Sequence, residues 1–199
     1  KFEVGNLFQL LMLDTRSIYR DKQLNIEDYF DGDTINKSKY KRDLSLDRKL
    51  IGLEQLLWIK NNLNKEFKWS IIGQQVLMAQ VYLPTIFANM NKKILPDYLH
   101  KYLKIGGANV PYNTDAWDGY PKERERLFRE LKKANSVLVL TGDTHNSWLN
   151  NLYDENNNFI GVDIGTPAIS SPNTIDTFGS LTDGIEEGFI KENKDVKWT

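Results

Sequence analysis

Residues Val137–Trp148 read VLVLTGDTHNSW, an apolar run rich in β-branched residues that stops at Gly-Asp-Thr-His. Such a run predicts a buried strand, and open α/β sheets build their sites at the carboxyl ends of strands. Asp143 and His145 are one residue apart, so in an extended segment or a tight turn both side chains can reach one ion. Carboxylate and imidazole together suit zinc, iron, manganese or calcium. The stretch therefore predicts half of a metal site.

A plainer interpretation of the same stretch stays open. Gly-Asp after a strand is a common turn, and a histidine in a loop is often only solvated. The chain has no cysteine, so a thiolate ligand and a disulfide are both excluded. Features elsewhere in the sequence are needed to choose between a metal site and an ordinary turn.

The composition is that of a globular protein without a strong overall charge. Apolar residues make up 40% of the 199 residues and charged residues 27%. The 26 basic and 27 acidic residues leave a net charge of -1, so no field attracts nucleic acid or anionic lipid. No apolar run approaches the roughly 20 residues of a membrane span, and the first residues lack the pattern of a signal peptide. We expect one domain over residues 1–199.

Apolar runs alternate with helical segments along most of the chain. Strands are expected at residues 7–14, 69–76 and 137–141, and helices at residues 46–63 and 121–135. In the first helix, leucines recur at helical spacing after Ser45, which can cap the first turn. Pro121 suits the first turn of the second helix. This order predicts an α/β fold with a mostly parallel sheet and right-handed crossovers.

The remaining segments are more polar or less regular. Loops are expected at residues 19–44, 106–120 and 165–173, the first of them as a lid on the surface. Residues 148–153 and 159–163 flank a polar turn, which is a hairpin signal. Residues 83–103 are ambiguous, with helical patches and a breaker at Pro96. The last five residues resemble the beginning of a strand.

Six short segments follow one another in a recognisable order. They are LDTRSIYRD (Leu13–Asp21), GLEQLLWIKNNL (Gly52–Leu63), WSIIGQQVLMA (Trp69–Ala79), AWDGYPKERERLF (Ala116–Phe128), LTGDTHNSW (Leu140–Trp148) and VDIGTPAISSP (Val162–Pro172). Together they resemble the PhoD-type alkaline phosphatases and phosphodiesterases of the calcineurin-like metallophosphoesterase superfamily. The segments extend over about four-fifths of the chain, which one chance motif match would not do.

The resemblance implies a metal-dependent phosphoric ester hydrolase that acts on phosphate mono- or diesters. In the family the Gly-Asp-x-His segment supplies metal ligands, which implies that Asp143 and His145 bind metal here. PhoD-type enzymes are associated with calcium and iron, and the wider superfamily with paired transition metals, so other divalent metals stay open. Kinship also implies two mixed sheets between helices, a four-layer α/β/β/α sandwich. Relatives are commonly extracytoplasmic, although this chain shows no export signal.

The chain departs from the family at its beginning. Family members start with strands that carry further aspartate and asparagine ligands, and nothing of this kind precedes Phe8. We therefore expect the C-terminal part of a PhoD-like domain, cut at both ends, with an incomplete metal centre and weak or no activity by itself. Surfaces exposed by the missing strands invite self-association. A noncatalytic binding or structural domain that keeps the phosphatase fold is the alternative function.

Arg16 and Asn146 are the candidate catalytic residues. Arg16 follows the first strand and can donate two hydrogen bonds to a phosphoryl group, which a lysine cannot do. An ion pair with Asp14 or Asp21 explains it equally well. Asn146 can orient His145 or contact the substrate, and a role in the turn competes with both.

Four other side chains lie in segments near the predicted site. Trp117 and Tyr120 could line a substrate pocket, although loop aromatics often anchor a loop to the core. Gln74 and Gln75 could support metal ligands, and ordinary hydrogen bonding at a strand end competes with that role. The chain contains neither a G-x-S-x-G elbow nor a P-loop, so a serine esterase and a P-loop nucleotide-binding protein lack support.

Overall fold

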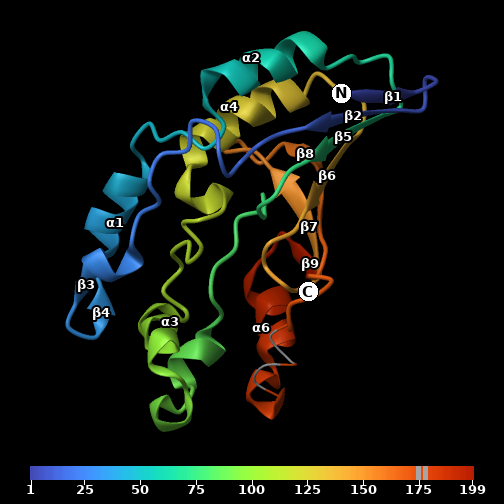
Figure 1. Ribbon diagram of the computed structural model, residues 1–199. Coiled ribbons are helices and arrows are strands. Elements are labelled where there is room, and N and C mark those ends of the chain that lie inside the picture. The colour runs from blue at the N-terminus through green and yellow to red at the C-terminus, as the bar shows by residue number, and fades with distance from the viewer. Residues whose placement is uncertain (174–175, 177–178) are drawn as a thin grey trace.

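The computed structural model describes residues 1–173, 176 and 179–199, and within them seven strands form one mixed sheet. The strands are β1 (Phe2–Val4), β2 (Phe8–Met12), β5 (Trp69–Gly73), β6 (Val137–Thr141), β7 (Trp148–Tyr153), β8 (Phe159–Gly165) and β9 (Val196–Trp198). Their order across the sheet is β1-β2-β5-β6-β8-β7-β9. The central strands β2, β5, β6 and β8 are parallel, and the others pair antiparallel (Figure 1). The α/β fold and the predicted hairpin are confirmed, although the sheet is less parallel than predicted.

The helices lie on one side of this sheet (Figure 1). They are α1 (Lys37–Leu44), α2 (Gly52–Asn62), α3 (His100–Ile105), α4 (Pro121–Leu131) and α6 (Ile185–Glu192), with short 3₁₀ turns η1 (Ile26–Tyr29), η2 (Thr85–Asn89), η3 (Lys92–Ile94), η4 (Asp97–Leu99), η5 (Trp117–Gly119) and η6 (Gly179–Thr182). Helices α1 and α3 stand farther from the sheet than the others (Figure 1), and helices α2 and α4 pack side by side. As predicted, α4 buries Leu127, Phe128 and Leu131. Among the described residues, no helix is long and apolar enough to cross a membrane.

The two faces of the sheet differ in what covers them. Alternate residues such as Leu11, Ile72 and Val139 point toward the helices and are completely buried. Their neighbours point the other way and form what we call the outer face. Its exposed members are Phe2, Val4, Met12, Trp69, Leu140, Leu149 and Trp198. Among the described residues, helices and loops thus cover only one face of the strands that the apolar runs predicted.

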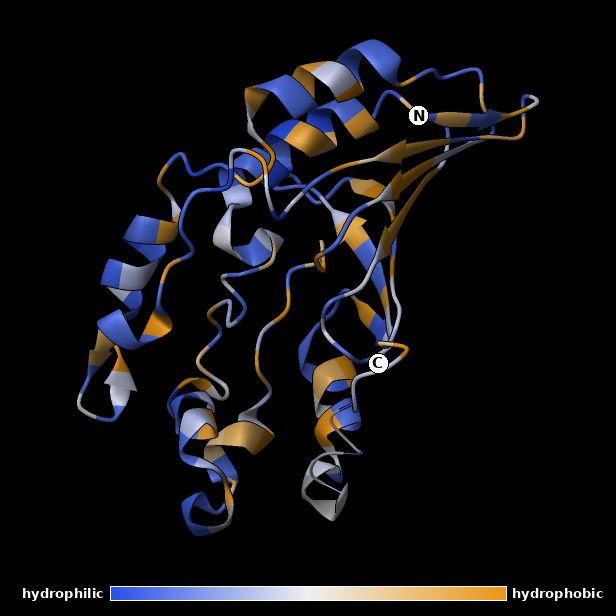
Figure 2. Ribbon diagram, viewed as in Figure 1, coloured by the Kyte–Doolittle hydropathy of each residue, from blue (hydrophilic) through white to orange (hydrophobic). Residues whose placement is uncertain are grey.

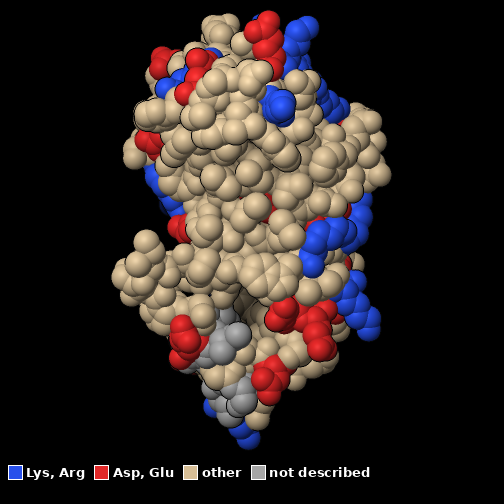
Figure 3. All heavy atoms as spheres, turned by 90° about the vertical axis from the view of Figure 1, so that its right-hand side faces the viewer, with Lys and Arg blue, Asp and Glu red and all other residues tan. Residues whose placement is uncertain are grey.

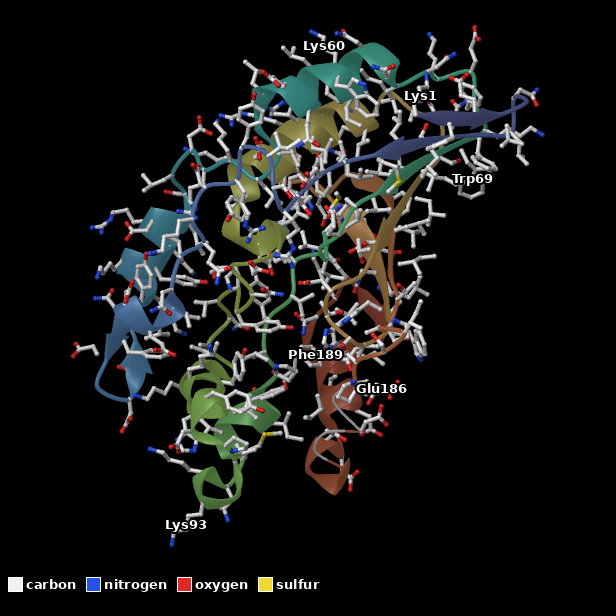
Figure 4. The ribbon with its side chains drawn as sticks, in the orientation of Figure 1. Lys1, Lys60, Trp69, Lys93, Glu186 and Phe189 are labelled. Carbon is white, nitrogen blue, oxygen red and sulfur yellow. The ribbon has the colours of Figure 1, made fainter. Side chains whose placement is uncertain are left out.

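The outer face forms a broad apolar surface. Strands β2 and β6 are hydrophobic along most of their length (Figure 2), and Figure 4 shows Trp69 pointing away from the helices. Viewed from that side, the middle of the molecule carries few charged side chains, and most of them lie around its rim (Figure 3). Large contiguous apolar surfaces are uncommon on monomeric proteins and mark places of interaction.

The prediction of a loop over residues 19–44 is wrong in part. The segment contains η1, helix α1 and a small second sheet made of β3 (Phe30–Asp31) and β4 (Thr34–Ile35). The side chain of Asn36 caps α1 by accepting a hydrogen bond from the N–H of Lys39. Tyr40 is completely buried, packs edge-on against Tyr29 and donates a hydrogen bond to the carbonyl of Pro111. A few buried aromatics order this segment, which is why aliphatic periodicity missed it.

The first predicted helix begins later than its leucines indicated. Helix α2 starts at Gly52, and Ser45 lies at the end of α1, where its N–H donates to the carbonyl of Lys41 at 3.0 Å. Leu53 and Leu57, which the spacing placed in the core, are 67% and 45% exposed. The leucine repeat of residues 46–57 therefore overstated the helix by about two turns at its start.

The cap of α2 comes from a distant part of the chain. The buried carboxylate of Glu123, in α4, accepts hydrogen bonds from the backbone N–H groups of Leu50, Ile51 and Gly52. Gly52 has φ +71°, and a Cβ atom there would lie 2.6 Å from Cβ of Tyr19. Glycine is therefore required at this point, where the helix begins.

Candidate functional site

The segment after β6 makes a strained turn. The N–H of Thr144 donates to the carbonyl of Gly142 at 2.9 Å, and Asp143 between them has φ +71°. These two features define a γ-turn with a positive φ at its central residue, a type that is rare and strained. His145 also has a left-handed backbone, with φ +61°, and both side chains are exposed. Strain at two successive candidate ligands is the kind of outlier that motivates a functional hypothesis.

Arg16 connects this turn to a second acid. Its Nη2 lies 2.5 Å from Oδ1 of Asp143, and its Nη1 lies 2.5 Å from Oδ2 of Asp115. Burial lowers the pKa of Arg16, but the hydrogen bonds to Asp115 and Asp143 raise it above its usual value. The structure therefore brings the candidate residues Arg16 and Asp143 together, although their positions in the sequence are far apart.

A second arginine holds Asp115 in place. Arg20 donates from Nη2 to the backbone carbonyl of Asp115 at 2.8 Å and also pairs with the Asp115 side chain. Its Nη1 donates to the carbonyl of Thr15 at 3.0 Å. The guanidinium of Arg20 also lies over the ring of Tyr120, 5.4 Å from its centroid. Arg20 is thus fixed on several sides and in turn fixes Asp115.

Gln75 ties the ends of three strands together. Its Oε1 accepts hydrogen bonds from the N–H and the hydroxyl of Thr15, at 2.7 and 2.6 Å. Its Nε2 donates to the carbonyl of Leu13 at 3.2 Å, and its own carbonyl accepts from the N–H of Gly142 at 3.3 Å. Gln75 alone thereby positions both the segment of Arg16, which follows β2, and the turn of Asp143, which follows β6. This is more than ordinary hydrogen bonding at one strand end.

Gln74, by contrast, has a local role. Its amide exchanges hydrogen bonds with the backbone of Val76, and its Oε1 accepts from the indole N–H of Trp117. Trp117 and Tyr120 are both completely buried, and the Tyr120 hydroxyl donates to the carbonyl of Asp21 at 2.7 Å. The suggestion that these aromatics line a pocket is wrong, since they anchor the loop before α4 to the core.

The suggested ion pairs of Arg16 with Asp14 or Asp21 are also wrong. Asp14 accepts hydrogen bonds from the N–H groups of Ser17 and Arg16, each at 2.8 Å, and these hold its pKa below the usual value. Asp21 accepts from the N–H of Lys49 at 2.7 Å. Both Asp14 and Asp21 accept hydrogen bonds from backbone N–H groups, and Arg16 instead pairs with Asp115 and Asp143.

Asn146 lies within the turn itself. Its Nδ2 donates to the carbonyl of Thr144 at 3.3 Å, and the Thr144 hydroxyl donates to the carbonyl of Asn146 at 3.4 Å. These contacts are those of a turn residue. Asn146 is next to His145 in the sequence, and these contacts join it to Thr144 on the other side of the histidine.

Sequence reasoning missed Asp115 and Arg20 and undervalued Gln75. Asp115 lies in the irregular segment before η5, where nothing in the local pattern separates it from other loop acids. Arg20 follows Arg16 by four residues, but this spacing has no meaning outside a helix. The one usable signal was the pair of glutamines directly after β5, because that strand lies between β2 and β6.

The donor atoms of the turn fit part of a cation site. Asp143 offers carboxylate oxygens and His145 an imidazole nitrogen, and neither is buried. Such oxygen and nitrogen donors suit first-row divalent metals and, for the oxygens, calcium. Among the described residues, no group of three or more histidine, cysteine, aspartate or glutamate side chains is close enough to hold a metal. The turn therefore offers two donor side chains, which is fewer than a complete metal site needs.

A mixed α/β sheet with these donors at a central strand end agrees with the family relationship that the sequence shows. The model of the PhoD-like phosphatases matches residues 1–199, and the chain belongs to that family. It is similar to alkaline phosphatase D of Bacillus subtilis (strain 168), with 33% identity over 205 residues. It also resembles the solved structure of PhoD, with 27% identity and a TM-score of 0.63.

These matches differ in how much of each protein they cover. The alignment to alkaline phosphatase D covers 99% of this chain and 29% of the relative, and the structural match covers 99% and 33%. The chain thus spans about a third or less of the proteins it resembles. The family resemblance that the six segments indicated is confirmed over the whole chain.

Proposed function

We propose that this chain is part of a metal-dependent phosphoric ester hydrolase in which Asp143 and His145 are metal ligands. The observation that supports the proposal most directly is the strained turn after β6, with both residues exposed and Arg16 on the Asp143 carboxylate. The family supports hydrolysis of phosphate esters, and we propose monoesters or diesters as the substrates. Calcium and iron are the proposed metals, and other divalent cations suit the same donors.

Each residue of the site has a distinct proposed role. Asp143 and His145 hold a cation at the end of β6. A bound cation there supplies charge that polarises the ester and lowers the pKa of bound water. Arg16 donates hydrogen bonds to a phosphoryl oxygen, for which its planar guanidinium is suited. Asn146 orients the adjacent His145 or contacts the substrate.

A second candidate is a noncatalytic domain that binds phosphate groups or packs against other protein. The observation that favours it is the shortage of ligands, because the described residues offer no cluster of three acids or histidines. Two protein ligands leave a divalent cation weakly held. We therefore propose weak or no turnover for this chain alone.

Hydrolysis of nitrophenyl phosphate monoester and diester tests the first proposal. The assay uses this chain and, in parallel, the longest natural protein that contains it, with calcium, iron or manganese added. We expect cation-dependent turnover in the longer protein and its loss in Asp143→Asn. Arg126→Gln is the control, because Arg126 pairs with Asp47 on the exposed surface. Full activity in Asp143→Asn refutes the ligand assignment, and cation binding without turnover in the longer protein supports the noncatalytic candidate.

We further propose that the sheet described here is one half of a four-layer sandwich within a single domain. The apolar outer face supports this, since it is suited to pack against the inner face of a second sheet. The strands carry apolar residues toward both sides, as strands buried on both faces do. Covering the face would remove side chains such as Trp69 and Met12, both about half exposed, from water.

Self-association of this chain tests the packing proposal. A chain with this face uncovered should form dimers or larger species as its concentration rises, because apolar faces of two copies can cover each other. Light scattering at several concentrations measures this, with Leu140→Glu, on the outer face, as the variant that should remain monomeric. A compact monomer at all concentrations that binds no apolar dye would contradict the proposal.

A further inference from the structure

One carboxylate oxygen of Asp143 is already engaged by a positive charge. Nη2 of Arg16 lies 2.5 Å from Oδ1, and the Asp143 side chain is 37% exposed. The opposite end of the same guanidinium is held by Asp115. Arg16 therefore lies between an acid that belongs to the strained turn and an acid that belongs to a different loop.

The charges of this cluster balance before any ligand arrives. Arg16 and Arg20 carry two positive charges, and Asp115 and Asp143 carry two negative charges. A divalent cation on Asp143 would add two positive charges within a few ångströms of the Arg16 guanidinium, and the two would repel each other. A phosphate group bound between them would remove this repulsion, because it pairs with both the cation and the guanidinium.

We propose that Arg16 is an exchangeable counterion of Asp143 and couples cation binding to phosphate binding. Without a cation, Nη2 of Arg16 neutralises Asp143. With a cation present, Nη2 leaves Asp143 and donates to a phosphoryl oxygen instead. This inference rests on the proposed function, because it takes Asp143 as a metal ligand.

Asp115 is the positioning residue in this scheme. Its carboxylate keeps Nη1 of Arg16 in place while Nη2 changes partner. Arg20 makes this possible, since it holds both the side chain and the carbonyl of Asp115. The geometry also explains why residue 16 is an arginine and not a lysine. A lysine ammonium could not remain on Asp115 and at the same time donate in a fixed direction to phosphate.

Manganese binding with and without inorganic phosphate tests the coupling. Electron paramagnetic resonance measures free Mn²⁺ and reports weak binding to this chain without any need for turnover. In the unaltered chain we expect inorganic phosphate to tighten Mn²⁺ binding by about fivefold or more, a typical coupling between two ligands. By linkage, Mn²⁺ should tighten phosphate binding by the same factor.

Substitution of Arg16 should act in opposite directions on the two ligands. In Arg16→Gln, Mn²⁺ alone should bind about two- to fivefold more tightly, because a competing ion pair of the exposed kind is gone. The tightening by phosphate should fall to almost nothing. In Arg16→Lys the charge stays, so bare Mn²⁺ should bind as before while the coupling weakens. A merely structural role of Arg16 would weaken both ligands together.

Asp115→Asn isolates the positioning role. It leaves the pair of Arg16 with Asp143 intact but removes the charge that holds Nη1, so the coupling should weaken while Mn²⁺ alone binds nearly as before. Arg126→Gln should match the unaltered chain in both measurements, because Arg126 is a partly exposed arginine that pairs with Asp47 outside the cluster. Circular dichroism confirms that each variant is folded.

The outcomes separate the two proposals. Equal Mn²⁺ binding by Asp143→Asn and the unaltered chain overturns the ligand assignment and hence the proposed function. Mn²⁺ binding that requires Asp143, with coupling to phosphate unchanged in Arg16→Gln, overturns only the exchange of Arg16. Tighter Mn²⁺ binding together with lost coupling in Arg16→Gln supports it.

Discussion

Two carboxylates in this molecule, those of Glu123 and Asp143, are placed in opposite circumstances. Glu123 is completely buried and accepts hydrogen bonds from three successive backbone N–H groups at the start of α2. Asp143 is more than a third exposed, lies in a strained γ-turn and pairs with Arg16. One acid is committed to the backbone, and the other is available to a ligand.

The difference teaches how to separate structural acids from candidate ligands. A buried carboxylate is tolerated only when hydrogen bonds replace the water it has lost, and once they do, its oxygens are occupied. An exposed acid held by an arginine is easily re-paired, because exposed ion pairs contribute little to stability. Burial and commitment to backbone donors therefore argue against a ligand role, whereas exposure on a strained backbone argues for one.

Replacing the buried acid should have the largest effect on stability. Glu123→Ala removes three hydrogen bonds to a charged group, each of about 1.5 kcal/mol, and leaves N–H groups unpaired at a helix start. We expect the free energy of unfolding to fall by about 4 kcal/mol or more. Urea unfolding followed by circular dichroism measures this.

Asp143→Asn is the matched comparison for that experiment. It removes the exposed ion pair with Arg16 and should change the free energy of unfolding by less than about 1 kcal/mol. A loss in Asp143→Asn as large as that in Glu123→Ala would break the distinction between the two acids.

Asp163 in β8 is an intermediate case, buried but incompletely satisfied. Its Oδ2 accepts hydrogen bonds from the N–H groups of Met78 and Ala79 at 2.9 and 3.0 Å. Contacts with the side chains of Thr141 and Asn150 lower the pKa of Asp163, yet within the described chain no hydrogen bond of normal geometry reaches its Oδ1. Burial outweighs these contacts and raises the pKa of Asp163 to about 6.

This raised pKa predicts a pH dependence of definite sign. Between the ordinary value of 3.8 and about 6, the folded state binds the proton more tightly than the unfolded state. The contribution of Asp163 to stability therefore falls as pH rises through this window and stays low above it. Asp163→Asn is neutral throughout and should exceed the unaltered protein by up to about 3 kcal/mol at pH 8.

Urea unfolding of both proteins at several pH values from 4 to 8 measures this difference. The other acids are common to both proteins, so their contributions cancel, and the difference should vanish near pH 4. A constant difference across the range would mean that Asp163 does not titrate there. Equal stability at pH 8 would show that the buried charge of Asp163 is fully compensated by its surroundings.

The elements that sequence alone predicted well are those with strong local signals. The apolar strands β2, β5 and β6, the hairpin of β7 and β8, and the amphipathic helix α4 all lie where their patterns placed them. The start of α2 and the position of α1 were missed. Both depend on contacts between distant residues, namely Glu123 with the α2 backbone and Tyr40 with Pro111, and no local window contains such contacts.

The candidate site divides in the same way. The sequence identified Asp143 and Arg16 as candidates because each follows an apolar strand, and the topology of parallel strands then brings them to one edge. It could not show that Arg16 joins Asp143 to Asp115, because that contact links residues almost 100 positions apart. The roles of Asp143 and His145 as metal ligands, and of Arg16 as a hydrogen-bond donor to phosphate, remain predictions.

The smallest expected effect concerns strain in the turn. His145 has φ +61°, so His145→Gly should relieve it, while the greater freedom of glycine in the unfolded chain takes back part of the gain. We expect a net gain of about 0.5 kcal/mol in the free energy of unfolding, together with loss of cation binding. Asn157→Gly is the control, because Asn157 has φ +60° in the β7–β8 turn and asparagine tolerates this conformation well. Its change should therefore be smaller. If His145→Gly instead lowers the free energy of unfolding, His145 stabilises the fold. The strained turn would then no longer indicate a functional role.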